Sequence, residues 1–362
     1  MLARALAIVL TLAPSFAAAQ DGKAAWDALV AAANKEGSVT VAGSRSPDAR
    51  RVMTERWRQD FPGIAIEYTV GSSTQWMPRM LEERKAGKFL WDIFATGPSG
   101  GLSLSHANAL SAMLPLLIRP DVKESSLWEG GIETLFIDEA NRVMGPFEQP
   151  ATIWYDSAKV APEKVERLGL AVLLEPEAKG KIAWQDPRIG GPGENYSYLI
   201  YHVLGEDGLK RILVDQQSTF FNAASEATTS VVRGRHWFVV GVQASTLEEF
   251  TKQGLGTTIK PMGTGPKVAF TGTGGMVLAA IEHPAHPNAQ KLFVNWFLTR
   301  EIQDLLSETD GLNSMRKDVE PHTAGGLVVL PGHADEYLNT SLERLLPEKK
   351  NVREIVKKYM PN

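Results

Sequence analysis

The chain has 362 residues, 43% of them hydrophobic and 22% charged, which is the composition of a globular protein of two domains and not of a disordered one. Its 38 basic and 42 acidic residues give a formal net charge of −4, which argues against nucleic acid or an anionic membrane surface as the partner. The sequence contains no Cys, and this excludes disulfides, thiolate metal sites and a lipid anchor on Cys.

The N-terminus has the pattern of a secretory signal peptide. Arg4 precedes an apolar run, Ala5 to Phe16, that is too short to span a bilayer. An alanine-rich segment typical of a signal-peptidase cleavage site follows this run. We predict cleavage after Ala19, which removes residues 1–19 and releases a monomeric mature protein into the periplasm. Loss of Arg4 makes the mature chain one charge more negative.

Strand and helix patterns alternate in the first part of the mature chain. An amphipathic helix is expected over 22–36, and short strands at 39–42, 64–70 and 91–95 each lead into a small polar turn and a helix. This alternation predicts a parallel α/β sheet, which binds its ligand at the carboxyl ends of the strands. The residues predicted to contact ligand in these turns are Ser44, Arg45, Ser46, Ser72, Ser73, Thr96, Gly97 and Ser99.

A second α/β pattern follows a long extended run, Val143 to Tyr155, which we interpret as a crossover between two lobes. Strands are then expected at 181–184, 239–242 and 268–271, with glycine-rich turns at 190–193 and 272–275 and a long helix from Pro287. The crossover and the later turns supply the remaining predicted contacts, at Gln149, Gly191, Gly193, Asn195, Gln243, Ser245 and Thr273.

Five segments carry a family resemblance: 34–40 (NKEGSVT), 60–68 (DFPGIAIEY), 81–92 (LEERKAGKFLWD), 179–187 (KGKIAWQDP) and 283–303 (HPAHPNAQKLFVNWFLTREIQ). In this order they resemble the extracellular solute-binding proteins of ABC importers of the ferric, thiamine, polyamine and sugar-phosphate type. The resemblance implies an α/β protein with the type II periplasmic-binding-protein fold, two α/β lobes joined by crossing hinge strands. It also implies a permease and an ATPase in the inner membrane as partners, and no enzymatic activity.

The same resemblance implies a division of the chain. The N-terminal lobe takes residues 20–144 and returns at 267–307, and residues 145–266 form the second lobe. Residues 308–362 are expected to be a C-terminal helical segment that packs on the second lobe.

The sequence departs from the iron-binding members of this family. Those members carry adjacent tyrosine ligands after the strand that follows a Gly-Glu turn. Here the matching turn is Gly234 and Arg235, and the tyrosine positions fall near Gln243, Ala244 and Ser245, so neither phenol is present. The hard oxygen ligands that iron prefers are therefore missing from this place.

An anionic organic ligand fits the remaining residues better. The guanidinium of Arg45 keeps its charge and presents a planar fork to carboxylate or phosphate, and helix N-termini add N–H donors. We therefore expect a phosphate ester, a phosphonate or a carboxylate, captured by lobe closure without a cofactor or a bound metal. A ferric-ion binder stays open as an alternative, with iron held through a carrier anion or by Tyr196 and Tyr198.

Two short motifs suggest other chemistry. The H-x-x-H pair of His283 and His286 lies in a proline-rich turn before a helix, so a zinc site is not expected there. Residues 97–101 fit G-x-S-x-G after a strand and before a helix, which leaves a serine hydrolase with Ser99 as nucleophile as an alternative of a different class. The partners nominated for it are Asp215 with His236 or His283.

Overall fold

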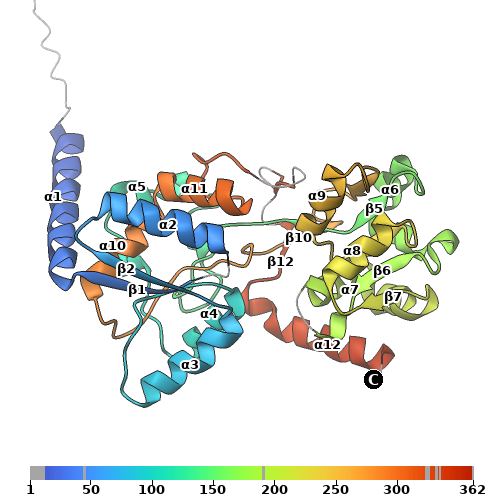
Figure 1. Ribbon diagram of the computed structural model, residues 1–362, viewed down its shortest axis with the longest axis horizontal. Helices are drawn as coiled ribbons and strands as arrows, with labels where there is room; N and C mark the ends of the chain where they lie inside the picture. The colour runs from blue at the N-terminus through green and yellow to red at the C-terminus, as the bar shows by residue number, and fades with distance from the viewer. Residues whose placement is uncertain are drawn as a thin grey trace, which may run out of the picture.

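The computed structural model describes residues 13–43, 46–189, 192–322, 327–330, 333 and 336–360, with the backbone alone at 13–21, 74, 192, 244 and 245. The elements gather in two lobes, one at each end of an elongated molecule, and a small sheet lies between them (Figure 1). Each lobe has its own buried apolar core. We call them the N-terminal lobe and the second lobe.

The N-terminal lobe is built on a four-stranded sheet in the order β11-β3-β1-β2. β1 (Ser38–Gly43) is parallel to β2 (Ala65–Val70) and to β3 (Ile93–Ala95), and β11 (Ala279–Ala280) is antiparallel to β3. Ile93 belongs to one buried cluster and Phe94 to another, because helices cover both faces of the sheet. Such doubly covered strands are apolar runs in the sequence, which is why β1 and β3 could be predicted, whereas the edge strand β2 alternates buried and exposed residues. The helices of this lobe are α1 (Ala13–Glu36), α2 (Pro47–Asp60), α3 (Ser73–Lys85), α4 (Pro98–His106), α5 (Pro120–Lys123), α10 (Pro287–Phe297) and α11 (Arg300–Asp310).

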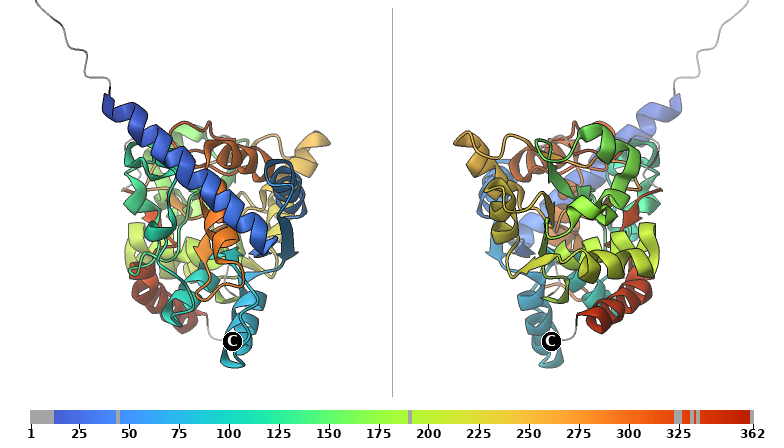
Figure 2. Two further views of the ribbon diagram at one scale, coloured as in Figure 1. Left: turned by 90° about the vertical axis from the view of Figure 1, so that its left-hand side faces the viewer. Right: turned by 90° about the vertical axis from the view of Figure 1, so that its right-hand side faces the viewer.

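Helix α1 lies obliquely across the end of the N-terminal lobe (Figure 2) and packs against α10. The carboxylate of Glu36, the last residue of α1, accepts hydrogen bonds from the backbone N–H groups of Asn288 at 3.0 Å and Ala289 at 2.8 Å. It thereby satisfies donors that the first turn of α10 would leave unpaired. α1 runs through Ala19, so cleavage there stays a prediction. No helix in the described part of the chain combines the length and the apolar character needed to span a bilayer.

The second lobe has a five-stranded sheet in the order β7-β6-β8-β5-β9. β6 (Ile182–Gln185) is parallel to β7 (Thr219–Phe221) and β8 (Phe238–Val240), whereas β5 (Trp154–Asp156) is antiparallel to β8 and β9 (Ile259–Pro261). Its helices are α6 (Pro162–Leu168), α7 (Pro192–Lys210), α8 (Ala224–Val232), α9 (Ala244–Lys252) and α12 (Leu346–Tyr359). Across both lobes there are 3-10 segments at Leu114–Leu116, Ser125–Leu127, Ile132–Leu135, Gly169–Leu174, Pro176–Ala178, Pro187–Ile189 and Glu343–Leu345, and a π-helical turn at Arg211–Asp215.

A three-stranded middle sheet joins the lobes. β10 (Ala269–Thr271) pairs with β4 (Ala151–Thr152) in antiparallel fashion and with β12 (Leu338–Asn339) in parallel. β4 and β10 lie in the predicted crossover and in the predicted strand 268–271. β12 belongs to the C-terminal segment and was not predicted. Three separate stretches of chain therefore pass between the lobes at this sheet.

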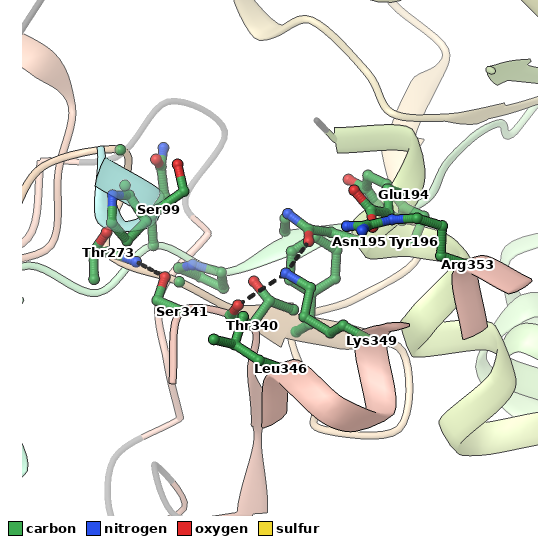
Figure 3. A pocket seen from close by; sticks show the side chains of 18 of the residues that line it. Ser99, Glu194, Asn195, Tyr196, Thr273, Thr340, Ser341, Leu346, Lys349 and Arg353 are labelled. Atoms are coloured by element: carbon green, nitrogen blue, oxygen red, sulfur yellow. Dashed lines mark hydrogen bonds and ion pairs between the residues drawn. The ribbon is translucent and has the colours of Figure 1, made fainter. Parts of the chain in front are cut away.

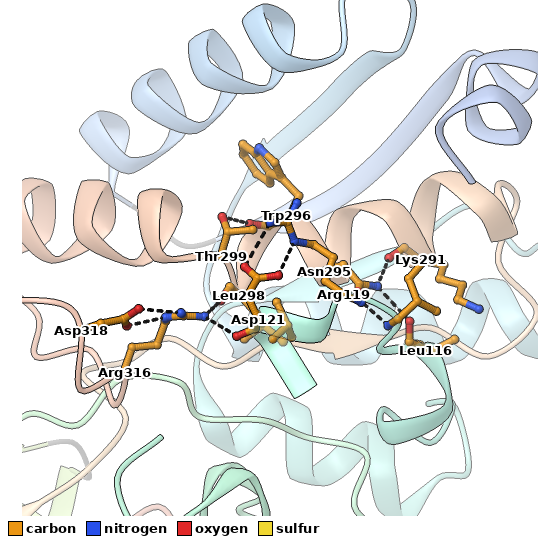
Figure 4. Close-up of polar contacts among 12 residues, drawn as sticks. Leu116, Arg119, Asp121, Lys291, Asn295, Trp296, Leu298, Thr299, Arg316 and Asp318 are labelled. Atoms are coloured by element: carbon orange, nitrogen blue, oxygen red, sulfur yellow. Dashed lines mark hydrogen bonds and ion pairs between the residues drawn. The ribbon is translucent and has the colours of Figure 1, made fainter. Parts of the chain in front are cut away.

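The C-terminal segment divides between the two lobes, which differs from the expectation that residues 308–362 pack on the second lobe alone. Leu312 lies in the core of the N-terminal lobe, and the buried Arg316 holds the following stretch there. Its guanidinium donates to both carboxylate oxygens of Asp318 at 2.8 Å and to the carbonyls of Asp121 at 3.2 Å and Leu298 at 3.0 Å (Figure 4). Only the later part reaches the second lobe, where Val352, Ile355 and Val356 of α12 are buried.

Candidate functional site

A cleft of about 950 Å³ lies between the lobes, beside the middle sheet. Its wall is formed by the first turn of α4, the middle sheet with the turn at 272–275, the first turn of α7, and one side of α12 (Figure 3). The aromatic rings of Trp154, Tyr196 and Phe270 give it an apolar part, and hydroxyl, amide and charged groups supply the rest. A small organic ligand with both apolar and polar parts suits such a wall.

Four of the predicted contact residues line this cleft: Ser99, Gln149, Asn195 and Thr273. Ser99 is exposed in the first turn of α4, with its Oγ 3.3 Å from the Oγ of Ser73. Gln149 is exposed in the crossover, where its backbone N–H donates to the carbonyl of Gly272 at 2.8 Å. The four residues come from both lobes and from the middle sheet, so the fold brings together turns that are far apart in the sequence.

Two residues in the wall carry buried polar groups without a described partner. Thr273 is 2% exposed and Trp154 is 8% exposed, and both line the cleft. Neither the hydroxyl of Thr273 nor the indole N–H of Trp154 has a hydrogen-bond partner among the residues described. The backbone N–H of Thr273 does have one, because it donates to the Oγ of Ser341 at 3.1 Å. Burial without a partner disfavours both groups, and a ligand that paired with them would relieve this cost.

Several other predicted contacts have structural partners away from the cleft. Ser46 is the N-cap of α2: its hydroxyl accepts from Ala49 N at 3.1 Å and donates to Asp310 at 2.6 Å. The N–H and hydroxyl of Ser72 donate to the Gln75 side chain at 2.9 and 3.1 Å, at the start of α3. These serines cap helices, as Ser commonly does at this position.

Four more predicted contacts take packing positions outside the lining of the cleft: Ser73, Thr96, Gly97 and Gly193. The Thr96 hydroxyl donates to the carbonyl of Gly71 at 3.3 Å. A Cβ on Gly97 would lie 3.0 Å from the Oγ of Ser73, which is itself buried. A Cβ on Gly193 would lie 2.1 Å from the carbonyl oxygen of Gln185, so only glycine lets α7 approach β6 this closely.

Five predicted contacts remain. The structure describes one of them, Gln243, in full and the other four in part or not at all. Gln243 is the exposed N-cap residue of α9, and its N–H donates to the hydroxyl of Thr228 at 3.0 Å. It is not among the residues that line the cleft. Of Ser245 only the backbone is described. The predicted contacts at Ser44, Arg45 and Gly191 lie outside the described residues.

The contribution of α12 was not predicted from the sequence. Four of its cationic side chains line the cleft: Lys349, Lys350, Arg353 and Lys357. Lys349, Arg353 and Lys357 are spaced four residues apart on one face of the helix, with Lys350 next to Lys349, and this spacing was the available sign. Two of the four are paired: Arg353 Nε lies 2.8 Å from Glu194, and Lys357 lies 2.9 Å from Glu354. The other two, Lys349 and Lys350, have no carboxylate partner in the part of the chain that the structure describes.

Lys349 is the most enclosed of these four cations. Its ammonium donates to the side-chain oxygen of Asn195 at 2.9 Å and to the carbonyl of Thr340 at 3.1 Å (Figure 3). Burial lowers the pKa of Lys349 below its ordinary value, and the nearby Glu194 opposes this shift. The site thus holds a partly desolvated positive charge bonded only to neutral acceptors, an arrangement that favours an anion.

The tyrosines nominated as iron ligands are occupied elsewhere. The Tyr196 hydroxyl donates to the carbonyl of Thr152 at 2.8 Å, and the Tyr198 hydroxyl donates to Glu348 at 2.8 Å. Burial raises the pKa of both phenols, so the phenolate that iron requires is disfavoured. His286 pairs with the buried Asp92 at 2.8 Å, but no group of three or more His, Asp or Glu side chains suited to a metal occurs among the residues described.

The triad of a serine hydrolase is not assembled around Ser99. The ring nitrogens of His236 contact the hydroxyls of Ser230 at 2.5 Å and Thr219 at 3.0 Å, and His283 packs its ring against Phe89. The one described hydrogen-bond contact of the Ser99 hydroxyl is with Ser73. A nucleophilic serine needs a base within hydrogen-bond reach, and the nominated histidines do not supply it.

The fold is shared with solved structures of solute-binding proteins. Iron-bound HitA from Pseudomonas aeruginosa matches with a TM-score of 0.64 at 15% identity, over 89% of this chain and 99% of that one. The substrate-binding protein of an ABC transporter from Agrobacterium tumefaciens matches with a TM-score of 0.55 at 16% identity, over 89% and 94%. AfuA from Actinobacillus pleuropneumoniae, solved with fructose-6-phosphate, matches with a TM-score of 0.59 at 13% identity, over 89% and 98%.

These likenesses confirm the predicted α/β periplasmic-binding-protein fold. No protein-family model matches the chain, and no curated protein does either. The identities are low, so the comparisons establish the architecture and leave the ligand to be argued from this chain's own residues.

Proposed function

We propose that this protein is the periplasmic solute-binding component of an ABC importer, and that it captures a small anionic organic solute by closure of its two lobes. Its solute would be a phosphate ester, a phosphonate or a carboxylate, and its partners would be a permease and an ATPase in the inner membrane. The observation that carries the proposal is the cleft between the lobes, whose wall contains two ammonium groups without a carboxylate partner among the described residues. In a chain of net charge −4, a cationic cleft is a local feature that selects for anions.

The architecture supports capture rather than catalysis. Ser99 and Thr273 lie toward one end of the cleft and Glu194 and Arg353 toward the other (Figure 3). Bending at the middle sheet would bring the lobes together over a ligand and exclude water, which strengthens each polar contact. Among the similar structures, the Agrobacterium protein belongs to an ABC transporter and AfuA was solved with a sugar phosphate, and both descriptions agree with the proposed role.

A ferric-ion binder is the second candidate, because HitA was solved with iron. The hydrogen bonds of Tyr196 and Tyr198 count against direct tyrosine ligation in this chain. A ferric ion carried by an anion such as citrate remains compatible with the cationic wall.

A thermal-shift scan of the mature protein tests the proposal. The panel comprises sugar phosphates, phosphonates, carboxylates and ferric citrate, with thiamine and polyamines as cationic compounds. A ligand at 100 times its dissociation constant adds about 2.7 kcal/mol to the free energy of unfolding, which is a measurable shift. Stabilisation by an organic anion supports the proposal, whereas stabilisation by cations alone would reject the anionic ligand.

A further inference from the structure

We infer that Lys349 of the C-terminal helix α12 binds the charged end of the solute, and that this end is a doubly charged oxyanion, a phosphate monoester or a phosphonate. The inference rests on the proposed solute-binding function and makes it more specific. It assigns the anion-binding role to a helix at the end of the chain, which the resemblance did not point to.

The hydrogen bonds of Lys349 leave one donor for the solute. An ammonium has three N–H groups, and two are accounted for by Asn195 and Thr340. The side chain lines the cleft, so the third group is available on that side. A charge-assisted hydrogen bond from a partly buried ammonium to an oxyanion is stronger than one between neutral groups.

A purely structural role would not require a charge at this position. The acceptors on Asn195 and Thr340 are neutral, and a neutral donor could link α12 to the first turn of α7 equally well. Burial disfavours the charged form of Lys349, and the nearby Glu194, which pairs with Arg353 and lies beyond ion-pair distance of Lys349, offsets this only in part. A charge kept in such a place at the expense of stability is typical of a functional site.

The number of unpaired cations indicates a dianion. Lys350, the neighbour of Lys349, also lines the cleft and has no described ion pair. Arg353 and Lys357 are neutralised by Glu194 and Glu354. Two positive charges therefore remain, which a phosphate monoester or phosphonate balances and a single carboxylate does not.

The rest of the cleft suits an uncharged, hydroxyl-bearing organic body. The rings of Trp154 and Tyr196 supply apolar contact, and the indole N–H of Trp154, unpaired among the described residues, is a hydrogen-bond donor. On the other side, the exposed Ser99 can pair with a hydroxyl group. A solute held by Lys349 at one end and by Ser99 at the other would contact α12 and the first turn of α4 together.

Calorimetric titration of the mature protein and three variants tests the inference. The probes are fructose 6-phosphate, glycerol 2-phosphate and methylphosphonate, with fructose and glycerol as uncharged counterparts and citrate and succinate as carboxylates. The variants are Lys349→Gln, Lys349→Arg and Lys358→Gln. Lys358 is the matched control, because it lies on the same helix, pairs with Glu206 at 2.9 Å and does not line the cleft.

We expect at least one phosphate or phosphonate probe to bind the wild-type protein. Lys349→Gln should weaken that binding by about tenfold or more, Lys349→Arg by less, and Lys358→Gln by less than about twofold. The melting temperature of the ligand-free Lys349→Gln protein should equal or exceed that of the wild type, because a buried charge has been removed. A merely structural lysine would instead give a lower melting temperature.

Three results would overturn the inference. Equal affinity of the wild-type and Lys349→Gln proteins for a phosphate probe would reject the role of Lys349. Binding of citrate or succinate but of no phosphate or phosphonate would reject the phosphate or phosphonate group and leave the solute-binding function standing. Failure of every organic anion in the panel would reject both the inference and the proposed function.

Discussion

The hydroxyl of Tyr196 donates a hydrogen bond to the carbonyl of Thr152 at 2.8 Å, and this bond connects the first part of α7 to strand β4 of the middle sheet. The ring of Tyr196 lines the cleft and packs edge-on against Phe270 at 5.0 Å, while its hydroxyl points into the protein. A tyrosine in the wall of the cleft is thus a packing residue with a satisfied hydroxyl, not a free phenol.

This geometry predicts that ferric iron does not bind through Tyr196. Forming the phenolate would break the bond to Thr152 and bury a negative charge, and burial already raises the pKa of this phenol. Titration of the mature protein with ferric citrate should therefore give no phenolate-to-iron absorbance band in the visible range. A band that appears in the wild type and is lost in Tyr196→Phe would contradict the prediction.

The fold could be predicted from the sequence where strands are buried on both faces. β1, β3, β6 and β8 are apolar runs bounded by turn residues, and this pattern is local. β4 and β12 have only two residues each, which is too short for any periodicity to show. The position of Arg316 was also not predictable, because an isolated arginine in a sequence gives no sign that Asp121 and Leu298 will surround it.

The site was predicted in part for similar reasons. Ser99, Asn195 and Thr273 follow strand ends or open helices, and the parallel-sheet rule places such turns beside a ligand. The same rule does not distinguish a residue that contacts ligand from one that caps a helix. Ser46 was predicted to contact ligand and is the N-cap of α2. Lys349 was missed because a run of cations on a helix usually faces solvent, and its burial depends on packing of α12 against the distant α7.

Arg316→Ala should be strongly destabilising. The substitution removes a buried guanidinium that bonds to Asp318, Asp121 and Leu298, and it leaves these acceptors unpaired in the N-terminal lobe. We expect the free energy of unfolding to fall by about 2–4 kcal/mol, measured by urea denaturation. Arg51→Ala, at a pair that is more than half exposed, should cost less than about 0.5 kcal/mol. Equal losses in the two variants would contradict this account of Arg316.

Glu148→Gln should stabilise the protein at neutral and alkaline pH. Glu148 is 8% exposed, and burial raises the pKa of its carboxyl above the ordinary 4.5. For an acid whose pKa is raised on folding, stability is lost as the pH rises from the unfolded value through the folded one. The glutamine carries no charge and avoids this loss, so we expect a gain of about 1–2 kcal/mol at pH 8 that disappears below about pH 4.5.

Urea denaturation of the Glu148→Gln protein across this pH range measures the effect. Glu166→Gln is the matched control, because Glu166 is exposed and has no described ion pair or hydrogen bond. The control should show no pH-dependent difference from the wild type. A Glu148→Gln protein that is less stable than the wild type at pH 8 would show that the carboxylate is favourably paired.

Gly193→Ala should weaken both stability and solute binding. The new Cβ would lie 2.1 Å from the backbone carbonyl oxygen of Gln185, which cannot move without shifting β6. We expect a loss of about 1–3 kcal/mol in urea denaturation, together with weaker binding, because the first turn of α7 carries Asn195. Gly265→Ala is the control: its Cβ would meet no atom within 4 Å, and its effect should be small. A Gly193→Ala protein as stable as the wild type would contradict this packing.

The affinity of the mature protein for fructose 6-phosphate should fall as the pH rises from 7.5 toward 10. The phosphate is a dianion throughout this range, so the change would come from the protein. Burial lowers the pKa of Lys349 below its ordinary 10.5, and the charged form that binds the anion is therefore lost at a lower pH than for a surface lysine.

Calorimetric titration of wild-type, Lys349→Arg and Lys350→Arg proteins at several pH values tests this dependence. Arginine keeps its charge to well above pH 10, so Lys349→Arg should bind with an affinity that hardly changes with pH. Lys350 is exposed and lines the same cleft, so the affinity of Lys350→Arg should decrease with rising pH as it does in the wild type. The contrary result is an affinity of Lys349→Arg that still decreases with rising pH while that of Lys350→Arg stays constant. That result would contradict the prediction and assign the anion to Lys350.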